Sequence, residues 1–331
     1  MNVDSLICSR LDRRGIEEIR AGGVDAVTVT CGFWEDAIES LDAVVSWREL
    51  AEANSDIAQI VASAADMREA RAAGRLGIVL GFQNSSFLQG RLGFVEVFAD
   101  VGVRVAQLTY NIQNDIGGSC YDPHDSGLSR FGAEVVGEMN RTGMVIDLSH
   151  VGNRTSLDAV HASSMPVAVT HANIFELVEH PRNKPLEVLR PLVERGGVIG
   201  LTTYHNLTRG RIATPELWSE MVARSIDLLG LTAVGIGTDA NQRGTDEYRE
   251  WMRRGRWSRQ PQLGASPPPG VAPSERPDWF SGPQDFGRLG AALEARGLGR
   301  EERELVLGGN WMNFYTRVID DVREKQMGGV A

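Results

Sequence analysis

The sequence predicts a single-domain (β/α)8 barrel, an α/β fold of eight parallel strands alternating with helices, over residues 1–331. Eight short apolar runs rich in Val, Ile and Thr recur along the chain, with helical patterns between them. Most runs do not alternate with polar residues, which is typical of strands buried on both faces of a parallel sheet. A doubly wound open sheet is the alternative, because the number of strands is easily miscounted from one sequence. The runs cover residues 3–8, 24–30, 76–82, 103–110, 144–150, 166–171, 197–204 and 233–239.

The segments between these runs carry helix signals. Residues 133–143 read as a helix that stops at Gly143. Residues 185–197 have apolar side chains at helical spacing, and Pro191 is expected to kink or shorten that helix.

Residues 240–282 follow the last predicted strand and show neither a helical nor a strand period. In a barrel this stretch leaves the sheet at the catalytic end, so it is predicted to form a lid or a subunit contact, or else a solvated mobile insertion. Six arginines lie between Arg243 and Arg259. They either contact an anionic substrate or form a solvated face balanced by nearby acidic residues.

Composition excludes several classes of partner. The net charge of -10 repels phosphate backbones, which argues against nucleic-acid binding. Three scattered cysteines are too few for a disulfide framework. No apolar run reaches the roughly 18 residues of a membrane-spanning helix, and the N-terminus does not read as a signal peptide. We therefore expect a cytoplasmic protein.

Polar residues end nearly all of the apolar runs. Active sites of (β/α)8 enzymes lie at the carboxyl ends of the strands, and a packed core does not require polar residues there. His150 and His171 end two successive runs, and Asp239 ends the last one. Two imidazoles and a carboxylate at one barrel mouth predict a site for zinc or a similar ion, although His150 taken alone is more typical of a hydrogen-bonded core histidine. The full set of run-end residues is Cys8, Thr30, Gln83, Tyr110, His150, His171, Tyr204 and Asp239.

Several motifs agree in order and spacing with one known family. They are LTYNIQN, MVIDLSHVG, PVAVTHAN, HPRNKP, GGVIGLTTY and GIGTDAN, followed near the end of the chain by GGNWMNFYTRV. With these motifs the chain resembles the membrane (renal) dipeptidase family of the amidohydrolase superfamily.

The resemblance implies roles for individual residues. In the family, two metal ions are held by a His-x-Asp motif on the first strand, a bridging Glu after the third, and one His each on the fifth and sixth. His150 and His171 match the last two ligands. Asp239 matches the acid that handles the proton of the attacking water. Arg182 matches the arginine that binds the substrate's terminal carboxylate, and Tyr204 matches a tyrosine near the substrate.

The chain departs from the family pattern at the metal ligands. Leu6 and Cys8 stand at the His and Asp of the first motif, and Gln83 stands at the bridging Glu. Leucine has no donor atom, and a neutral amide bridges two dications poorly. One ion, zinc or another divalent metal, is therefore expected rather than two. Gln83 or Asp239 and water would complete the shell around the two histidines.

The resulting expectation is a metal-dependent hydrolase of a C–N bond, peptide or amide, in a small carboxylate-bearing or dipeptide-like substrate. Asp239 would transfer the proton, Tyr110 would donate a hydrogen bond to the developing oxyanion, and Arg182 would clamp the carboxylate. A decarboxylase or C–N lyase on the same scaffold is one alternative, and a catalytically inactive binding protein is another. The resemblance also implies a homodimer.

Overall fold

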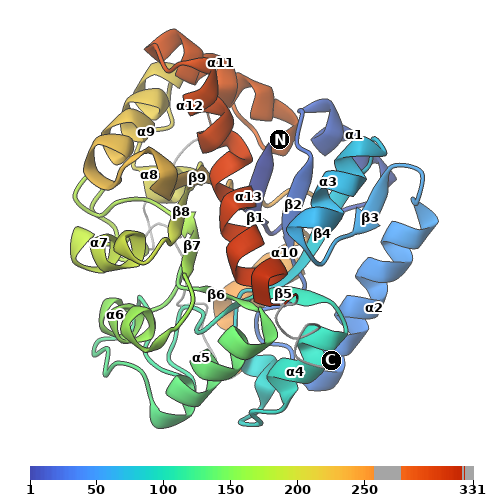
Figure 1. The fold of residues 1–331 in the computed structure, drawn as a ribbon, viewed down its shortest axis with the longest axis vertical. Coiled ribbons are helices and arrows are strands. Elements are labelled where there is room, and N and C mark those ends of the chain that lie inside the picture. The colour runs from blue at the N-terminus through green and yellow to red at the C-terminus, as the bar shows by residue number, and fades with distance from the viewer. Residues whose placement is uncertain (257–276, 323, 325–331) are drawn as a thin grey trace.

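The computed structural model describes residues 1–256, 277–322 and 324, and its centre is a parallel sheet in the order β1-β2-β4-β5-β6-β7-β8-β9. The backbone of Cys8 donates to Ala240 O at 2.8 Å and that of Asp239 donates to Leu6 O at 3.0 Å, which joins the last strand to the first. The eight-stranded barrel is thereby confirmed, and the open sheet is wrong (Figure 1). The barrel strands are β1 Val3–Ile7, β2 Ala26–Thr30, β4 Leu76–Phe82, β5 Val103–Gln107, β6 Val145–Asp147, β7 Ala168–Ala172, β8 Val198–Leu201 and β9 Val234–Ile236.

A ninth strand, β3 (Ala58–Ile60), was not predicted. It pairs with Leu76–Ile78 at the start of β4, whereas β5 pairs with the end of β4. With three residues, β3 is too short to give a pattern of its own in the sequence.

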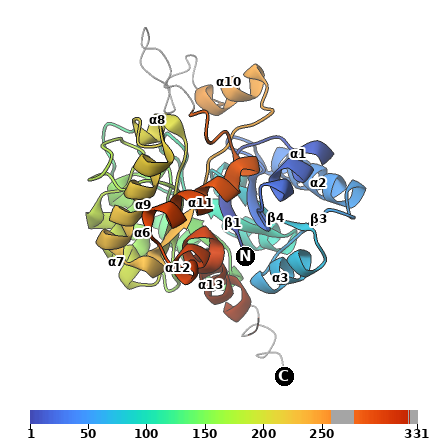
Figure 2. The ribbon, with the colours of Figure 1, turned by 90° about the horizontal axis from the view of Figure 1, so that it is seen from above.

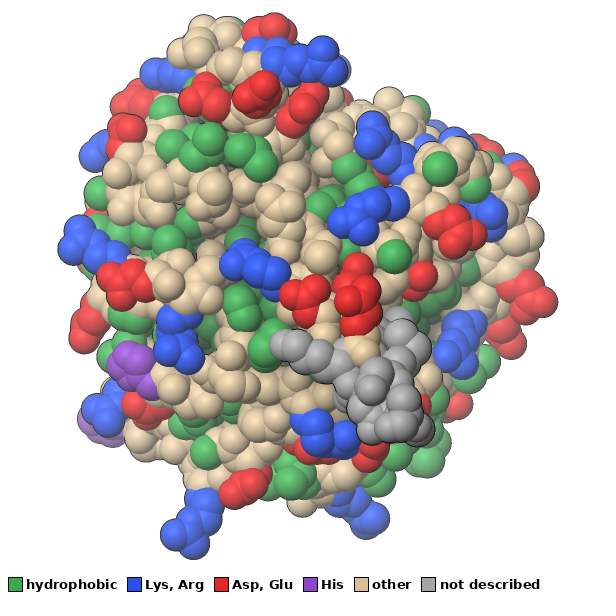
Figure 3. Space-filling model, in the orientation of Figure 1, with side chains coloured by type: hydrophobic (Ala, Val, Ile, Leu, Met, Phe, Trp, Pro, Cys, Tyr) green, Lys and Arg blue, Asp and Glu red, His purple; other side chains and the backbone are tan. Residues whose placement is uncertain are grey.

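The amino-terminal end of the barrel is closed by packing. Helix α13 (Asn310–Tyr315) lies across it (Figure 1). Its Trp311 and Tyr315 side chains pack in one buried cluster with a single residue from each of seven barrel strands. Trp311 Nε1 donates to Ile236 O at 3.1 Å. Acidic and basic side chains are scattered together over this face of the molecule (Figure 3). The opposite end, where the strands terminate, is the barrel mouth.

Two predicted helices are confirmed. Helix α5 (Arg130–Thr142) ends at Gly143, which adopts the left-handed conformation with φ 68°. Helix α7 (Leu186–Glu194) runs through Pro191. No helix among the described residues is long and apolar enough to cross a membrane. The other helices are α1 Arg13–Ala21, α2 Ala37–Ala53, α3 Ala64–Ala72, α4 Phe94–Asp100, α6 Asn153–Ala162, α8 His205–Thr208, α9 Pro215–Leu229, α10 Asp246–Arg254, α11 Phe286–Arg296 and α12 Arg300–Glu304.

Helix α10 corrects the expectation that residues 240–282 lack regular structure. Thr245 caps its start by accepting a hydrogen bond from Tyr248 N at 3.1 Å. Figure 2 places α10 at the mouth end of the barrel, on the side opposite α13. The helix was missed because its few apolar residues form one narrow stripe. Residues 257–276 of the predicted lid lie outside the described part of the chain.

Candidate active site at the barrel mouth

The two predicted imidazoles meet at the mouth. His150 lies three residues beyond the end of β6, and His171 lies within β7. Both side chains are buried, and their Nε2 atoms are 3.1 Å apart. Neighbouring parallel strands therefore bring these two nitrogens together, as the run-end pattern predicted.

Each ring is oriented through its other nitrogen. His150 Nδ1 lies 2.6 Å from the side-chain oxygen of Asn111, which accepts its proton. His171 Nδ1 lies 2.8 Å from Thr170 Oγ1. That hydroxyl donates to Asp147 Oδ2 at 2.6 Å, so it accepts from His171 Nδ1. These partners favour the tautomer of each ring that carries its proton on Nδ1, which leaves the two Nε2 lone pairs facing each other.

The surroundings keep both rings neutral. Burial, followed by the positive charge of Arg182, lowers the pKa of His150 and of His171 well below the usual range. Two lone pairs 3.1 Å apart repel each other unless a cation lies between them. Zinc–nitrogen bonds of about 2.0–2.1 Å in a tetrahedral shell place two ligand nitrogens about 3.3–3.4 Å apart. The imidazole pair therefore fits one ion.

Asp239 belongs to a neighbouring group centred on Cys8. Its carboxylate accepts from the Cys8 thiol at 3.2 Å, and Gln83 Nε2 donates to the same sulfur at 2.8 Å and to Thr30 Oγ1 at 3.0 Å. Burial raises the pKa of Asp239 to about 6 and raises that of Cys8 well above its usual value. The thiol is thus protonated, and the carboxyl group exchanges its proton near neutral pH.

Asp239 also has unusual backbone geometry. Its φ is 54°, in the left-handed region that residues with a Cβ seldom adopt.

Among the described residues, no group of three or more His, Cys, Asp and Glu side chains is placed to hold a metal. The structure therefore offers two nitrogen ligands, His150 and His171, and engages Asp239 and Gln83 with Cys8.

Arg182 and Tyr204 lie on the β7–β8 side of the mouth. Arg182 is only 2% exposed, and its guanidinium donates to Ser149 O and, at 3.1 Å, to His171 O. It therefore braces the backbone beside both histidines, which the sequence did not reveal. Tyr204 and Asp239 line a cavity of about 30 Å³, and the Tyr204 hydroxyl accepts from Asn206 Nδ2 at 2.8 Å.

Aromatic side chains cover the β1–β2 side of the mouth. We call Phe33, Trp34, Tyr110, Tyr248 and Trp251 the aromatic cap; it packs in one cluster with Leu6 and Cys8. The Tyr110 ring centroid lies 4.3 Å from that of His150 and 4.8 Å from that of Phe33. Tyr248 comes from α10 and lies 5.9 Å from Phe33. The cap therefore runs without a break from the histidine pair to α10.

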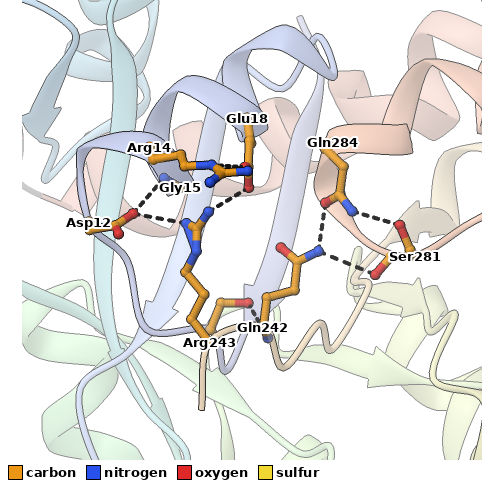
Figure 4. Close-up of polar contacts among 9 residues, drawn as sticks. Asp12, Arg14, Gly15, Glu18, Gln242, Arg243, Ser281 and Gln284 are labelled. Atoms are coloured by element: carbon orange, nitrogen blue, oxygen red, sulfur yellow. Dashed lines mark hydrogen bonds and ion pairs between the residues drawn. The ribbon is translucent and has the colours of Figure 1, made fainter.

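The segment that carries α10 is tied to the barrel by polar contacts. Arg243 pairs with Asp12 at 2.9 Å and Glu18 at 2.8 Å, and Gln242 Nε2 donates to Gln284 Oε1 at 2.7 Å (Figure 4). Arginines of this region thus pair with acids, which favours the solvated-face interpretation over substrate contact. Further pairs join Arg249 to Asp246, Arg254 to Glu250 and Arg256 to Glu39.

Comparisons with known proteins agree with this geometry. Residues 12–250 match the family described as membrane dipeptidase (peptidase family M19). The chain belongs to this family. An amidohydrolase from Pseudomonas aeruginosa superposes with a TM-score of 0.89 at 33% identity, covering 97% of both chains. A metallo peptidase from Rhodobacter sphaeroides, liganded with a phosphinate mimic of L-Ala-D-Ala, has a TM-score of 0.78 at 16% identity over 96% of this chain and 99% of its own, which supports the fold.

Curated relatives are longer than this chain. Dipeptidase verJ from Clonostachys rogersoniana is 31% identical over 257 residues, which are 72% of this chain and 66% of that protein. The uncharacterized dipeptidase C965.12 from Schizosaccharomyces pombe is 31% identical over 211 residues, 62% of this chain and 50% of that protein. The matched regions therefore span half to two thirds of these relatives.

Proposed function

We propose that this protein is a metal-dependent hydrolase that cleaves a peptide or amide bond in a small, carboxylate-bearing, dipeptide-like substrate, with one divalent ion per chain. The observation that carries the proposal is the pair of neutral imidazoles with facing Nε2 atoms 3.1 Å apart. Membership of a metallopeptidase family supports the same chemistry.

His150 and His171 would hold the ion, and zinc suits imidazole ligands. When bound, such an ion polarises a carbonyl and lowers the pKa of water to about 7. By resemblance, Leu6, Cys8 and Gln83 occupy the positions of further metal ligands. Leu6 lacks a donor atom, and the Gln83 amide nitrogen is engaged with Cys8, so these residues support a single ion.

The remaining site residues supply proton transfer and binding. Asp239, with its pKa of about 6, accepts a proton from the attacking water and returns it to the leaving nitrogen. Burial keeps Tyr110 protonated by raising its pKa well above the usual value, so its hydroxyl is available as a donor to the developing oxyanion. Arg182 retains N–H donors beyond its two backbone bonds for a substrate carboxylate, with Tyr204 on the same side.

Oligomeric state and location are proposed from the sequence. The resemblance supports a homodimer, and the three scattered cysteines support a reducing, cytoplasmic location. Size-exclusion chromatography with light scattering checks the first proposal: a mass of twice 36.1 kDa is expected, and 36.1 kDa would contradict it.

Metal analysis and a substrate screen test the function. We expect about one ion per purified chain and chelator-sensitive release of amine from dipeptides or N-acyl amino acids. His150→Ala should lose metal and turnover, whereas His161→Ala, an exposed histidine on α6, should behave as the wild type. Two tightly held ions would contradict the single site, and an active His150→Ala variant would contradict the function. Release of carbon dioxide, or of amine without uptake of water, would indicate decarboxylation or a lyase reaction instead.

A further inference from the structure

A buried acid–threonine link lies beneath the histidine pair. Asp147 on β6 accepts from Thr170 N at 2.9 Å and Ser149 N at 3.0 Å through Oδ1, and from Thr170 Oγ1 at 2.6 Å through Oδ2. The Ser149 hydroxyl also donates to Oδ1, at 2.6 Å. All of these groups are buried, so the contacts are made without competition from solvent.

The same link occurs a second time in the barrel. Asp4 on β1 accepts from Thr238 N at 2.8 Å through Oδ1 and from Thr238 Oγ1 at 2.6 Å through Oδ2. In each copy the threonine directly precedes a site residue: Thr170 precedes His171, and Thr238 precedes Asp239. The copies differ at two points: the Ser149 hydroxyl has no counterpart at Leu6, and only the Thr170 hydroxyl continues into an imidazole.

We propose that Asp147 and Thr170 are positioning residues that hold the proton of His171 on Nδ1 and so keep its Nε2 lone pair available to a metal ion. The Thr170 hydroxyl has a single proton, which it commits to Asp147 Oδ2. His171 Nδ1, 2.8 Å from the same oxygen, must therefore be the donor. The inference rests on the proposed function insofar as it requires a metal on His171.

Substitution of Asp147 or Thr170 changes the hydrogen bonds that run from His171 through Thr170 to Asp147. Asp147→Asn reverses their direction, and Thr170→Val removes them. An amide in Asp147→Asn presents N–H donors to Thr170 Oγ1, so the threonine hydroxyl turns its proton toward His171 Nδ1. The imidazole proton then moves to Nε2, which no longer has a lone pair for the ion. Thr170→Val removes the link and leaves the volume nearly unchanged. Loss of such outer contacts to a metal-binding histidine typically costs 10–100-fold in metal affinity.

The experiment measures cobalt(II) affinity by competition with a chelator in the full-length protein. We expect the dissociation constant to rise about 10–100-fold in Asp147→Asn and Thr170→Val, and to change less than about threefold in Thr170→Ser, which keeps the hydroxyl. Thr28→Val is the matched control, because Thr28 is a buried barrel threonine whose hydroxyl contacts Tyr315 at 3.3 Å. It too should bind cobalt as the wild type does.

Nitrogen-15 NMR of the metal-free protein gives a second readout that a merely structural role would not change. The wild type should show His171 protonated on Nδ1, and Asp147→Asn should show it protonated on Nε2. Wild-type cobalt affinity in Thr170→Val, or an Nε2 proton on His171 in the wild type, would overturn the proposed role of the acid–threonine link. If Asp147→Asn does not fold, the Thr170→Val and Thr170→Ser pair decides.

The two proposals fail in different ways. A wild-type protein that takes up no ion contradicts the proposed function, while the NMR measurement still decides the His171 tautomer. A wild type that binds cobalt through His150, with unchanged affinity in Thr170→Val, contradicts only the role of the acid–threonine link.

Discussion

The two sides of the barrel mouth are built from the same kind of strand but carry different side chains. On the β6–β7 side, His150 and His171 are oriented by hydrogen bonds to their Nδ1 atoms and present two free lone pairs. On the β1–β2 side, Leu6 and Cys8 lie under the aromatic cap and α10. The first side presents nitrogen atoms that suit a cation, whereas the second is packed with mostly apolar side chains.

This difference shows that the fold alone does not fix the chemistry of the site. Closure of the barrel brings Cys8 against Asp239, and strand pairing brings the two histidines together. Which of these contacts can hold a metal depends on single residues at the strand ends and on the groups behind them.

The largest effect is expected on the histidine side. His171→Ala removes one of two nitrogen ligands and should lower kcat/KM by at least about 10³-fold, since both metal binding and the polarisation that depends on it are lost. Steady-state kinetics with added zinc measures the change, and circular dichroism confirms that the variant is folded. Activity within tenfold of the wild type would remove the histidine pair from the mechanism.

Asp239, where the two sides meet, should set the pH dependence. Its pKa is raised to about 6 by burial, and only the ionised form accepts a proton. The kcat/KM should therefore rise about tenfold per pH unit below 6 and level off above it. In Asp239→Asn this limb should disappear together with most of the activity. A profile that is flat between pH 5 and 7 in the wild type would contradict the assignment.

The aromatic cap should affect stability more than metal binding. Trp251→Ala removes a half-buried ring and its hydrogen bond to Glu35 at 2.8 Å, so the free energy of unfolding should fall by about 2 kcal/mol. Arg253→Ala, an exposed neighbour on α10, should change stability by less than about 0.5 kcal/mol. Chemical denaturation compares the two. Loss of the bound ion in Trp251→Ala would show that the two sides are not independent.

Asp4, beneath the β1–β9 junction, should make stability depend on pH. Burial raises its folded-state pKa from 3.8 to about 7. Because this pKa is raised, the Asp4 carboxyl group stabilises the folded state fully below pH 3.8. That stabilisation, up to a few kcal/mol, is lost as the pH rises through 7. Asp4→Asn should flatten this part of the stability profile. Equal slopes in the two proteins, from denaturation between pH 4 and 7, would contradict the shift.

The buried barrel strands could be predicted from apolar runs in the sequence, whereas contacts between residues far apart in the chain could not. All eight barrel strands gave apolar runs, whereas β3 and α10 were too short or too polar to show a period. His150 and His171 stood out because imidazoles ended apolar runs. The partners that orient them, Asn111 and Thr170, look ordinary in sequence because their roles depend on where hydroxyl and amide groups point after folding.

The aromatic cap was hidden for a similar reason. Phe33 and Trp34 follow β2 in a loop, and Tyr248 comes from a helix more than two hundred residues later. Only closure of the barrel brings them together over Leu6 and Cys8. Arg182 was predicted from a motif as a substrate clamp, but its bonds to two backbone carbonyls form only in the folded chain and leave no pattern in the sequence.

Anomalous X-ray diffraction from crystals grown with zinc tests the central claim most directly. The account predicts one zinc peak per chain, about 2.0–2.1 Å from the Nε2 atoms of both His150 and His171, and none beside Leu6. The absence of a peak between the two imidazoles, or a second peak at Cys8, would contradict it.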